Sequence, residues 1–490
     1  MNVPKIAAPG GADYTGATEK CMTTRDAFAF LNRIAGIAPL KSPHFEGDDP
    51  ILPTPFRVAS AAAAALGLGA AAANETWRLR GGSQQEISLG LNAAASSLVS
   101  FALQRLNGQS LSREEKPTTG LYRAMDGRWI HLHGGFPHLE KRTLDLLNCD
   151  NTKDGVAAAV ARWSAFALED SLAFMGQCGA VVRTEEEWRA TPQGAALANA
   201  PVIALKRIGD APPLRLPESD KPLGGIRVLD LTRVLAGPSA GRTLASYGAD
   251  VLSVRADWLP TIDVFDLDTG HGKRSTFLDL TKPGDAEILR GLARGAHVFV
   301  DSYKPGALAA LGFSPPALAH VAPGIVYVSL SCYGTQGPWA QRRGWEQLAQ
   351  SATGVAVEQG GFAAARAGSR RESVPQLIPA AACEYITGYL AAAGVAAALL
   401  RRIREGGSWL VEVSLCATAT WLQSLGKLNA ASVPESWKPG AGLDGYFQSC
   451  ETGRGRLDYL GPVVRMEKTP PAWRNPPPEP GADRPRWLVE

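Results

Sequence analysis

From residue 226 onward, apolar runs alternate with amphipathic stretches. The runs “IRVLDLT”, “HVFVDSY” and “IVYVSLSCYG” are typical of buried strands, and “SAGRTLASYG” and “GDAEILRGLARG” between them are typical of helices. Strands that alternate with helices predict an α/β fold with a doubly wound, Rossmann-like parallel sheet. A ligand is expected beyond the carboxyl ends of these strands.

The first two hundred residues follow a different pattern. An Ala-rich helix within residues 56–106 precedes “LYRAMDGRWIHLHGGF”, in which Asp-Gly between two apolar runs predicts a hairpin. Helical spacing of apolar residues over 153–190 predicts two or three helices after it. These elements indicate a small α+β domain.

Proline and glycine density sets the expected domain boundaries. We expect a lead-in over residues 1–50, a partial domain over 51–210, a linker over 211–224, a Rossmann-like large domain over 225–430 and an irregular Pro-rich segment over 431–490.

An internal repeat relates the two halves. The stretch “WRLRGGSQQEISL” resembles “RRIREGGSWLVEVSL”, and each follows an Ala-rich helix. Aligning Gly81 with Gly406 places Ala59 opposite Glu384. The chain therefore holds two copies of one supersecondary unit.

Composition narrows the classes of function. The chain has 490 residues, 45% hydrophobic and 20% charged, with a formal charge of +3 and no basic block interleaved with aromatics, which disfavours nucleic acid as a partner. No uncharged apolar run is long enough to span a membrane, and the N-terminus lacks a secretory signal. Seven cysteines without CxxC spacing disfavour a disulfide framework or structural zinc. We expect a cytoplasmic protein.

Two glycine turns could hold an anion. “VLAGPSAG” follows a strand and opens a helix, although it is not a dinucleotide-binding motif. “GHGKRS” places Lys273 and Arg274 beside a turn, where they form either a solvated basic turn or a phosphate clamp.

Other reactive side chains have ordinary explanations. His131, His133 and His138 could ligate a metal, but no acid or cysteine is near in sequence, so a hydrogen-bonded surface pair is favoured and no metal is expected. Cys383 lies on an apolar segment, where cysteine is usually a small core residue. An acid such as Glu384 at the start of a helix is stabilised by the helix dipole alone.

Several motifs carry a resemblance to a known family. “VLDLTRVLAGPSAGRTLASYGADVLSV”, “GHGKRSTFLDL”, “VDSYKPGALAALGF” and “RRGWEQLAQSATG” resemble the family III CoA-transferases, the CaiB/BaiF group. The N-terminal lobe resembles the later part of the same family, so the domain order looks rotated. The resemblance implies coenzyme A at the carboxyl edge of a Rossmann-like sheet, a small second domain and an intertwined homodimer.

The resemblance also assigns Glu384 a role. In the family, an aspartate nucleophile heads an Ala-rich helix, with glycines four and ten residues later, and here Glu384 precedes Gly388 and Gly394. Ala59 occupies the matching position of the first copy, and the alanine side chain has no nucleophilic group. Glutamate has the same functional group on a longer stem.

Further residues are implied by the same motifs. The coenzyme A positions are Val234, Ala236, Lys273, Arg274, Ser302, Tyr303 and Arg343, and the acid expected in the acyl pocket is Glu346. Ser302 stands where Asn is common. The implied substrates are an acyl-CoA and a carboxylic acid, which exchange coenzyme A through a covalent glutamyl-CoA thioester.

Two alternatives remain at this point. The first alternative is a homologue that binds coenzyme A without catalysis. Two features agree with it: glutamate replaces the aspartate nucleophile, and some of the coenzyme A positions are altered. A racemase of the same family would need paired histidine and aspartate bases, and Trp345 occupies the histidine position.

Overall fold

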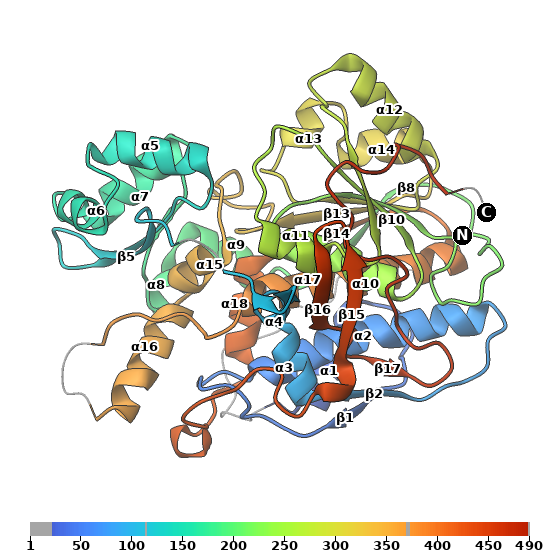
Figure 1. The fold of residues 1–490 in the computed structure, drawn as a ribbon, viewed down its shortest axis with the longest axis horizontal. Helices are drawn as coiled ribbons and strands as arrows, with labels where there is room; N and C mark the ends of the chain where they lie inside the picture. The colour runs from blue at the N-terminus through green and yellow to red at the C-terminus, as the bar shows by residue number, and fades with distance from the viewer. Residues whose placement is uncertain (1–21, 113–114, 369–372, 489–490) are drawn as a thin grey trace, which may run out of the picture.

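The computed structural model describes residues 22–112, 115–368 and 373–488. A seven-stranded sheet lies at its centre (Figure 1). The strands, in spatial order, are β11 (Lys273–Phe277), β10 (Asp250–Arg255), β9 (Arg227–Leu231), β12 (Val298–Asp301), β13 (Val326–Ser331), β14 (Ser408–Ser414) and β8 (Ala204–Gly209). All neighbours are parallel except β14 and β8, so the doubly wound parallel sheet is confirmed.

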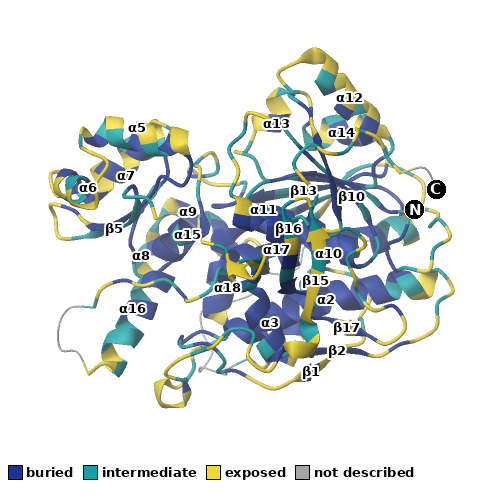
Figure 2. Ribbon diagram, in the orientation of Figure 1, coloured by how far each residue is buried: buried dark blue, intermediate teal, exposed yellow. Residues whose placement is uncertain are grey.

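Helices cover both faces of this sheet because its strands alternate apolar side chains between them. In β12, Val298 and Val300 pack on one side with α10 (Ala236–Ser246) and α17 (Ala382–Glu405), whereas Phe299 packs on the other. The second side is covered by α12 (Pro283–Arg294), α13 (Ala307–Ala310) and α14 (Pro315–Val321). Figure 2 shows α10, α17 and the strands deeply buried, with an exposed outer surface on α12.

The predicted small domain is a three-stranded antiparallel sheet with helices beside it, at the upper left of Figure 1. The hairpin is confirmed, because β5 (Thr119–Arg123) pairs with β6 (Trp129–His133) across the Asp-Gly turn. The other elements are β7 (Gly179–Val181), α5 (Pro137–Leu147), α6 (Lys153–Val160), α7 (Ala165–Phe174), α8 (Glu185–Ala190) and α9 (Pro192–Ala198).

The repeated helices pack against each other. α2 (Val58–Leu79) lies along α17, and a Cβ on Gly69 would stand 3.8 Å from the Cα of Ala393, so the backbones cross closely. β2 (Ile87–Gly90) follows α2 as β14 follows α17, but belongs to a separate three-stranded sheet with β1 (His44–Glu46) and β17 (Arg465–Met466). α1 (Thr24–Ile34) packs on α2, and α3 (Leu91–Ser97) and α4 (Ser100–Leu103) follow β2.

Two boundaries differ from the sequence expectation. The segment 431–490 contains a hairpin of β15 (Phe447–Thr452) and β16 (Gly455–Leu460), extended by β3 (Arg105–Leu106) and β4 (Gln109–Ser110). β15 is largely exposed and lacks an apolar face, which is why alternation did not reveal it. β8 lies before the linker yet completes the large sheet, because it pairs with β14.

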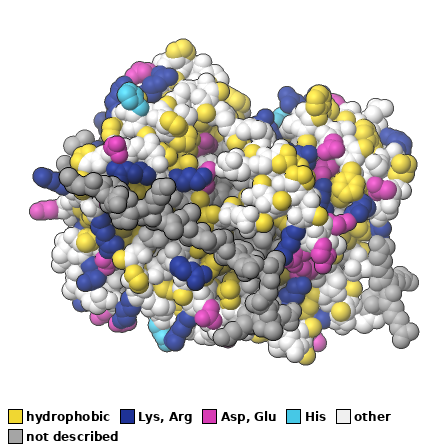
Figure 3. Space-filling view, turned by 180° about the vertical axis from the view of Figure 1, so that it is seen from behind, with side chains coloured by type: hydrophobic (Ala, Val, Ile, Leu, Met, Phe, Trp, Pro, Cys, Tyr) yellow, Lys and Arg dark blue, Asp and Glu magenta, His cyan; other side chains and the backbone are white. Residues whose placement is uncertain are grey.

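α17 is the one described helix long and apolar enough to cross a membrane, and it is wholly buried inside the protein, as a core helix is. On the face drawn in Figure 3, Lys and Arg side chains are interspersed with Asp and Glu, and no large field of one sign is visible among the described residues.

Candidate active site

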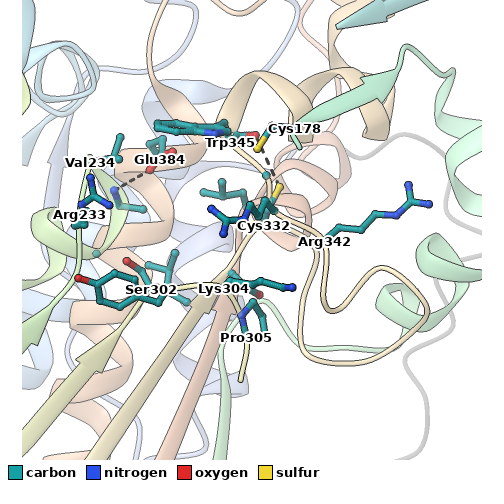
Figure 4. A pocket seen from close by; sticks show the side chains of 18 of the residues that line it. Cys178, Arg233, Val234, Ser302, Lys304, Pro305, Cys332, Arg342, Trp345 and Glu384 are labelled. Carbon is teal, nitrogen blue, oxygen red and sulfur yellow. Dashed lines mark hydrogen bonds between the residues drawn. The ribbon is translucent and has the colours of Figure 1, made fainter. Parts of the chain in front are cut away.

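A pocket with about 170 Å³ of space for water lies at the carboxyl ends of β9, β12 and β13 (Figure 4). The large domain contributes Arg233, Val234, Ala236, Ser302, Tyr303, Lys304, Cys332, Arg342, Arg343, Trp345 and Glu384 to its lining. The small domain and the segment around it contribute Phe136, Leu139 and Cys178. Its position is that expected of a ligand site in an open parallel sheet.

Glu384 is held in this pocket by the start of another helix. Its Oε2 accepts a hydrogen bond of 2.8 Å from the backbone N–H of Ala236, the first residue of α10, and its carboxylate also accepts from the backbone N–H of Glu346. Burial raises the pKa of Glu384 to about 7, while these hydrogen bonds oppose the rise. The carboxylate therefore changes charge close to neutral pH.

Glu346 makes the reciprocal contact. It begins α15 (Glu346–Thr353), and its Oε1 accepts from the backbone N–H of Cys383 at 2.8 Å and from Nε2 of Gln350 at 2.9 Å. Burial, followed by the negative charge of Glu384, raises the pKa of Glu346 to about 8. The starts of α10, α15 and α17 thus converge on two buried carboxyl groups, and each start carries partial positive charge.

The glycine spacing after Glu384 has a packing reason. A Cβ on Gly388 would lie 2.5 Å from the carbonyl oxygen of Ala236, so glycine is needed for α17 to approach α10 closely. A Cβ on Gly394 would lie 2.6 Å from Cγ1 of Val411 on β14. Together the two glycines let Glu384 reach the Ala236 N–H.

The turn between β9 and α10 is strained at Val234. Its φ of 75° lies in the left-handed region, which a β-branched residue rarely adopts. Such strain is typical of functional sites. The conformation turns the chain sharply, so that the N–H groups at the start of α10 face the pocket.

Most of the expected site residues lie together. Val234, Ala236, Ser302, Tyr303, Arg343 and Glu384 line the pocket. Glu346 is 5% exposed and lies beneath it, bonded to the start of α17. Trp345 also lines the pocket, and Cys383 is fully buried, as expected for a core residue.

Lys273 and Arg274 are not brought to the pocket. They begin β11 and so lie at the amino end of the edge strand, away from the carboxyl edge. Lys273 Nζ pairs with Asp230 at 2.6 Å, and Arg274 binds Asp250 at 2.9 Å and the carbonyl of Arg486 at 2.8 Å. Both are buried in these structural ion pairs, which corrects their expected place at the ligand.

The histidines differ from the expected surface pair. His131 and His133 are buried, with His131 Nδ1 2.9 Å from Ser351 Oγ and His133 stacked on Trp345 at 4.2 Å. Burial lowers the pKa of His131 to about 4, so it stays neutral at pH 7. In the described part of the chain, no three His, Cys, Asp or Glu side chains are grouped as a metal site requires.

Sequence reasoning missed Arg233, Lys304 and the small-domain residues. Arg233 directly precedes Val234 in the turn after β9, so its place in the same motif was a usable signal. No sequence signal pointed to Phe136, Leu139 and Cys178, because only the folded arrangement brings their segments to the pocket of the large domain.

Comparison with known proteins shows a similarity to one family. Residues 223–442 match the model of CoA-transferase family III. An acetyl-coenzyme A transferase, nodX, of Hypoxylon pulicicidum is 31% identical over 62% of this chain and 54% of its own length. An acyl-CoA transferase of Gibberella moniliformis is 28% identical over 89% of both chains, and human succinyl-CoA:glutarate CoA-transferase is 30% identical over 41% and 48%.

Among solved structures, Rv3272 from Mycobacterium tuberculosis is 32% identical, with a TM-score of 0.38 over 42% of this chain and 57% of that one. The chain thus spans about half the length of several of these relatives, and most of the Gibberella enzyme. The single alignment along the Gibberella enzyme means that the two proteins share their order of segments.

Proposed function

Because residues 223–442 match the model of CoA-transferase family III, we propose that this chain moves coenzyme A between an acyl-CoA and a carboxylic acid, with Glu384 as the nucleophile. One observation carries the proposal: the Glu384 carboxylate lies in the pocket at the starts of α10 and α15, bonded to the Ala236 N–H. Such an arrangement suits covalent acyl chemistry, in which negative charge develops on oxygen.

The first half of the reaction transfers coenzyme A to the protein. A Glu384 oxygen attacks the thioester carbon, the carbon–sulfur bond breaks, and the thiolate leaves behind a mixed anhydride. The thiolate then attacks the Glu384 carbonyl carbon of this anhydride, and the bond to the donor acyl oxygen breaks. The donor departs as a carboxylate, and Glu384 carries coenzyme A as a thioester.

The second half runs the same steps in reverse with a new acid. The acceptor carboxylate attacks the Glu384 thioester and releases the thiolate, which then attacks the acceptor carbonyl of the new anhydride. Acceptor-CoA leaves, and Glu384 returns to a carboxylate without net gain or loss of protons. The N–H groups of Ala236 and Glu346 are the donors that stabilise oxyanions at Glu384.

Glu346 acts as a positioning residue in this scheme. Its carboxyl group accepts the Cys383 N–H and so fixes the start of α17, on which Glu384 stands. Because burial and the charge of Glu384 raise the pKa of Glu346 to about 8, Glu346 is mostly protonated near neutral pH and Glu384 is the first of the pair to ionise.

The test is to trap the intermediate. The protein is incubated with an acyl-CoA and hydroxylamine or borohydride, and the Glu384 peptide is examined by mass spectrometry for hydroxamate or reduction to the alcohol. We expect modification at Glu384 and none in the Glu384→Gln variant. Coenzyme A binding without any adduct would favour a binding homologue, and α-proton exchange in deuterated water without transfer would favour a racemase.

A further inference from the structure

A buried ion pair contacts both ends of the turn between β9 and α10. Asp230 on β9 and Lys273 at the start of β11 are 1% and 3% exposed, and Oδ2 of the first lies 2.6 Å from Nζ of the second. Asp230 also accepts a hydrogen bond from the hydroxyl of Thr232, where the turn begins. Lys273 Nζ also donates to the carbonyl of Pro238 at 2.7 Å, in the first turn of α10. The ion pair therefore joins the beginning of the turn to its end.

Glycines let α10 lie directly on this ion pair. A Cβ on Gly241 would lie 2.5 Å from Asp230 Oδ2 and 3.0 Å from Lys273 Nζ. A Cβ on Gly237 would lie 2.4 Å from Cβ of Thr232. The first turns of α10 are therefore packed against the pair without a gap, so the position of the helix start depends on it.

The turn needs such support because Val234 is strained. Its φ of 75° is unfavourable for a β-branched residue, and a strained conformation persists only where its surroundings fix it. The hydrogen bonds of Thr232 and Pro238 lie on either side of Val234 and fix the turn there. This conformation directs the N–H of Ala236 toward Glu384, to which it donates at 2.8 Å (Figure 4).

A second ion pair on the same strand lacks these contacts. Arg274 follows Lys273 on β11 and pairs with Asp250 on β10 at 2.9 Å. Its other partner is the carbonyl of Arg486, at 2.8 Å. Among the hydrogen bonds and ion pairs of the described residues, none joins this second pair to the turn between β9 and α10. The two pairs are similar in type and position, and only the first can act on the turn.

Resting on the proposed function, we propose that Asp230 and Lys273 are positioning residues for the transfer of coenzyme A. They fix the start of α10 so that the Ala236 N–H points at Glu384, where it stabilises the carboxylate and the oxyanion that forms during attack. Lys273 thus acts on the reaction through the carbonyl of Pro238, and not through a contact with the substrate.

The experiment removes each ion pair as a unit. Asp230→Asn combined with Lys273→Met removes both charges of the first pair, because either substitution alone leaves a buried charge without its partner. Asp250→Asn combined with Arg274→Met is the matched control. In the first double variant we expect kcat for transfer to fall at least about tenfold, with KM for the acyl-CoA within about threefold, because a misplaced donor affects the oxyanion more than substrate binding. The control should keep both values close to those of the wild type.

A second readout needs no substrate. The pKa of Glu384, raised by burial to about 7, is measured by infrared difference spectra against Glu384→Gln over a range of pH. The Ala236 N–H lowers this pKa, so we expect it to rise in the first double variant, in which the net charge is unchanged, and to stay constant in the control. If the wild type transfers no coenzyme A, the proposed function fails, and this readout still tests the positioning.

A milder substitution tests the same contact. Thr232→Val removes one hydrogen bond to Asp230 and keeps both charges, so it applies even where the double variant does not fold. It should lower kcat and raise the pKa of Glu384 by smaller amounts, and Thr232→Ser, which keeps the hydroxyl, should restore both. Equal effects of the two double variants would mean that the first pair only stabilises the fold. A raised KM at unchanged kcat, or an unchanged pKa of Glu384 in the first double variant and in Thr232→Val, would also overturn the proposal.

Discussion

Glu346→Gln is expected to make the protein more stable at alkaline pH. The amide oxygen of glutamine can still accept from Cys383 N–H and Gln350 Nε2, so the substitution removes the charge and keeps the shape. In the wild type, burial and the charge of Glu384 raise the pKa of Glu346 from 4.5 to about 8. A buried carboxyl with a raised pKa binds its proton more tightly in the folded state than in the unfolded state.

The sign and size follow from proton linkage. Between the unfolded and folded pKa values the folded state holds the extra proton, so the free energy of unfolding of the wild type falls as pH rises through this window. Each unit of pKa difference corresponds to about 1.4 kcal/mol, which gives on the order of 4 kcal/mol between about pH 5 and about pH 9. Glutamine does not titrate, so the variant lacks this loss.

Calorimetric unfolding of both proteins across this pH range measures the effect. The unfolding temperature of Glu346→Gln is expected to rise relative to that of the wild type as pH increases, since all other titrating groups are shared. Glu405→Gln, at the exposed end of α17, is the matched control and should follow the wild type throughout. Parallel pH profiles for Glu346→Gln and the wild type would refute the reasoning, because Glu346 would then ionise as it does in the unfolded chain.

Four further predictions concern the pocket. The value of kcat/KM for transfer should fall about tenfold per pH unit below about 7, because burial raises the pKa of Glu384 to about 7 and only the carboxylate attacks; a flat profile from pH 5 to 7 would contradict this. Glu384→Asp shortens the side chain by one methylene and withdraws it from the Ala236 N–H, so kcat should drop about 100-fold, and unchanged kcat would mean that the contact is dispensable. Gly388→Ala places a Cβ 2.5 Å from the Ala236 carbonyl and should destabilise the fold by about 1–3 kcal/mol in urea unfolding, whereas Gly291→Ala, which meets no atom within 4 Å, should not. Trapping should label one glutamate per chain, because Ala59 stands opposite Glu384 in the first copy; intact-mass measurement of two labels would contradict it.

The sequence predicted the centre of the large sheet well because the strands there are buried on both faces. β12 (VFVD) and β13 (VYVSLS) are mostly apolar, and such runs between amphipathic helices leave few alternatives. The hairpin of the small domain was predictable for another reason, since Asp-Gly fixes the turn locally. β15 and β8 were not assigned to their sheets, because pairing with β16 and β14 depends on distant parts of the chain.

The site could be predicted only in part. Family motifs gave Glu384 and the turn that holds it, and the structure adds the reason for the spacing, which is the close approach at Gly388. The same motifs led to the wrong prediction that Lys273 and Arg274 lie at the ligand. The sequence pattern of a basic pair beside a glycine turn is the same whether it stands at the amino or the carboxyl end of a strand. Sequence alone does not show that Asp230 and Asp250 neutralise these two cations inside the fold.

The internal repeat explains how one chain can complete a single pocket. The start of α2 keeps a carboxylate cap, since Asp49 accepts the Ser60 N–H at 2.8 Å just as Glu346 accepts the Cys383 N–H at the start of α17. Beside that cap stands the fully buried Ala59, so the first copy offers no group for covalent chemistry. The small domain that follows α2 instead supplies Phe136 to the pocket of the second copy, where its ring supports Arg233. The first copy therefore contributes to the lining of the pocket around Glu384. If the proposed transfer occurs there, substitutions in the first copy should alter substrate preference more than the covalent step.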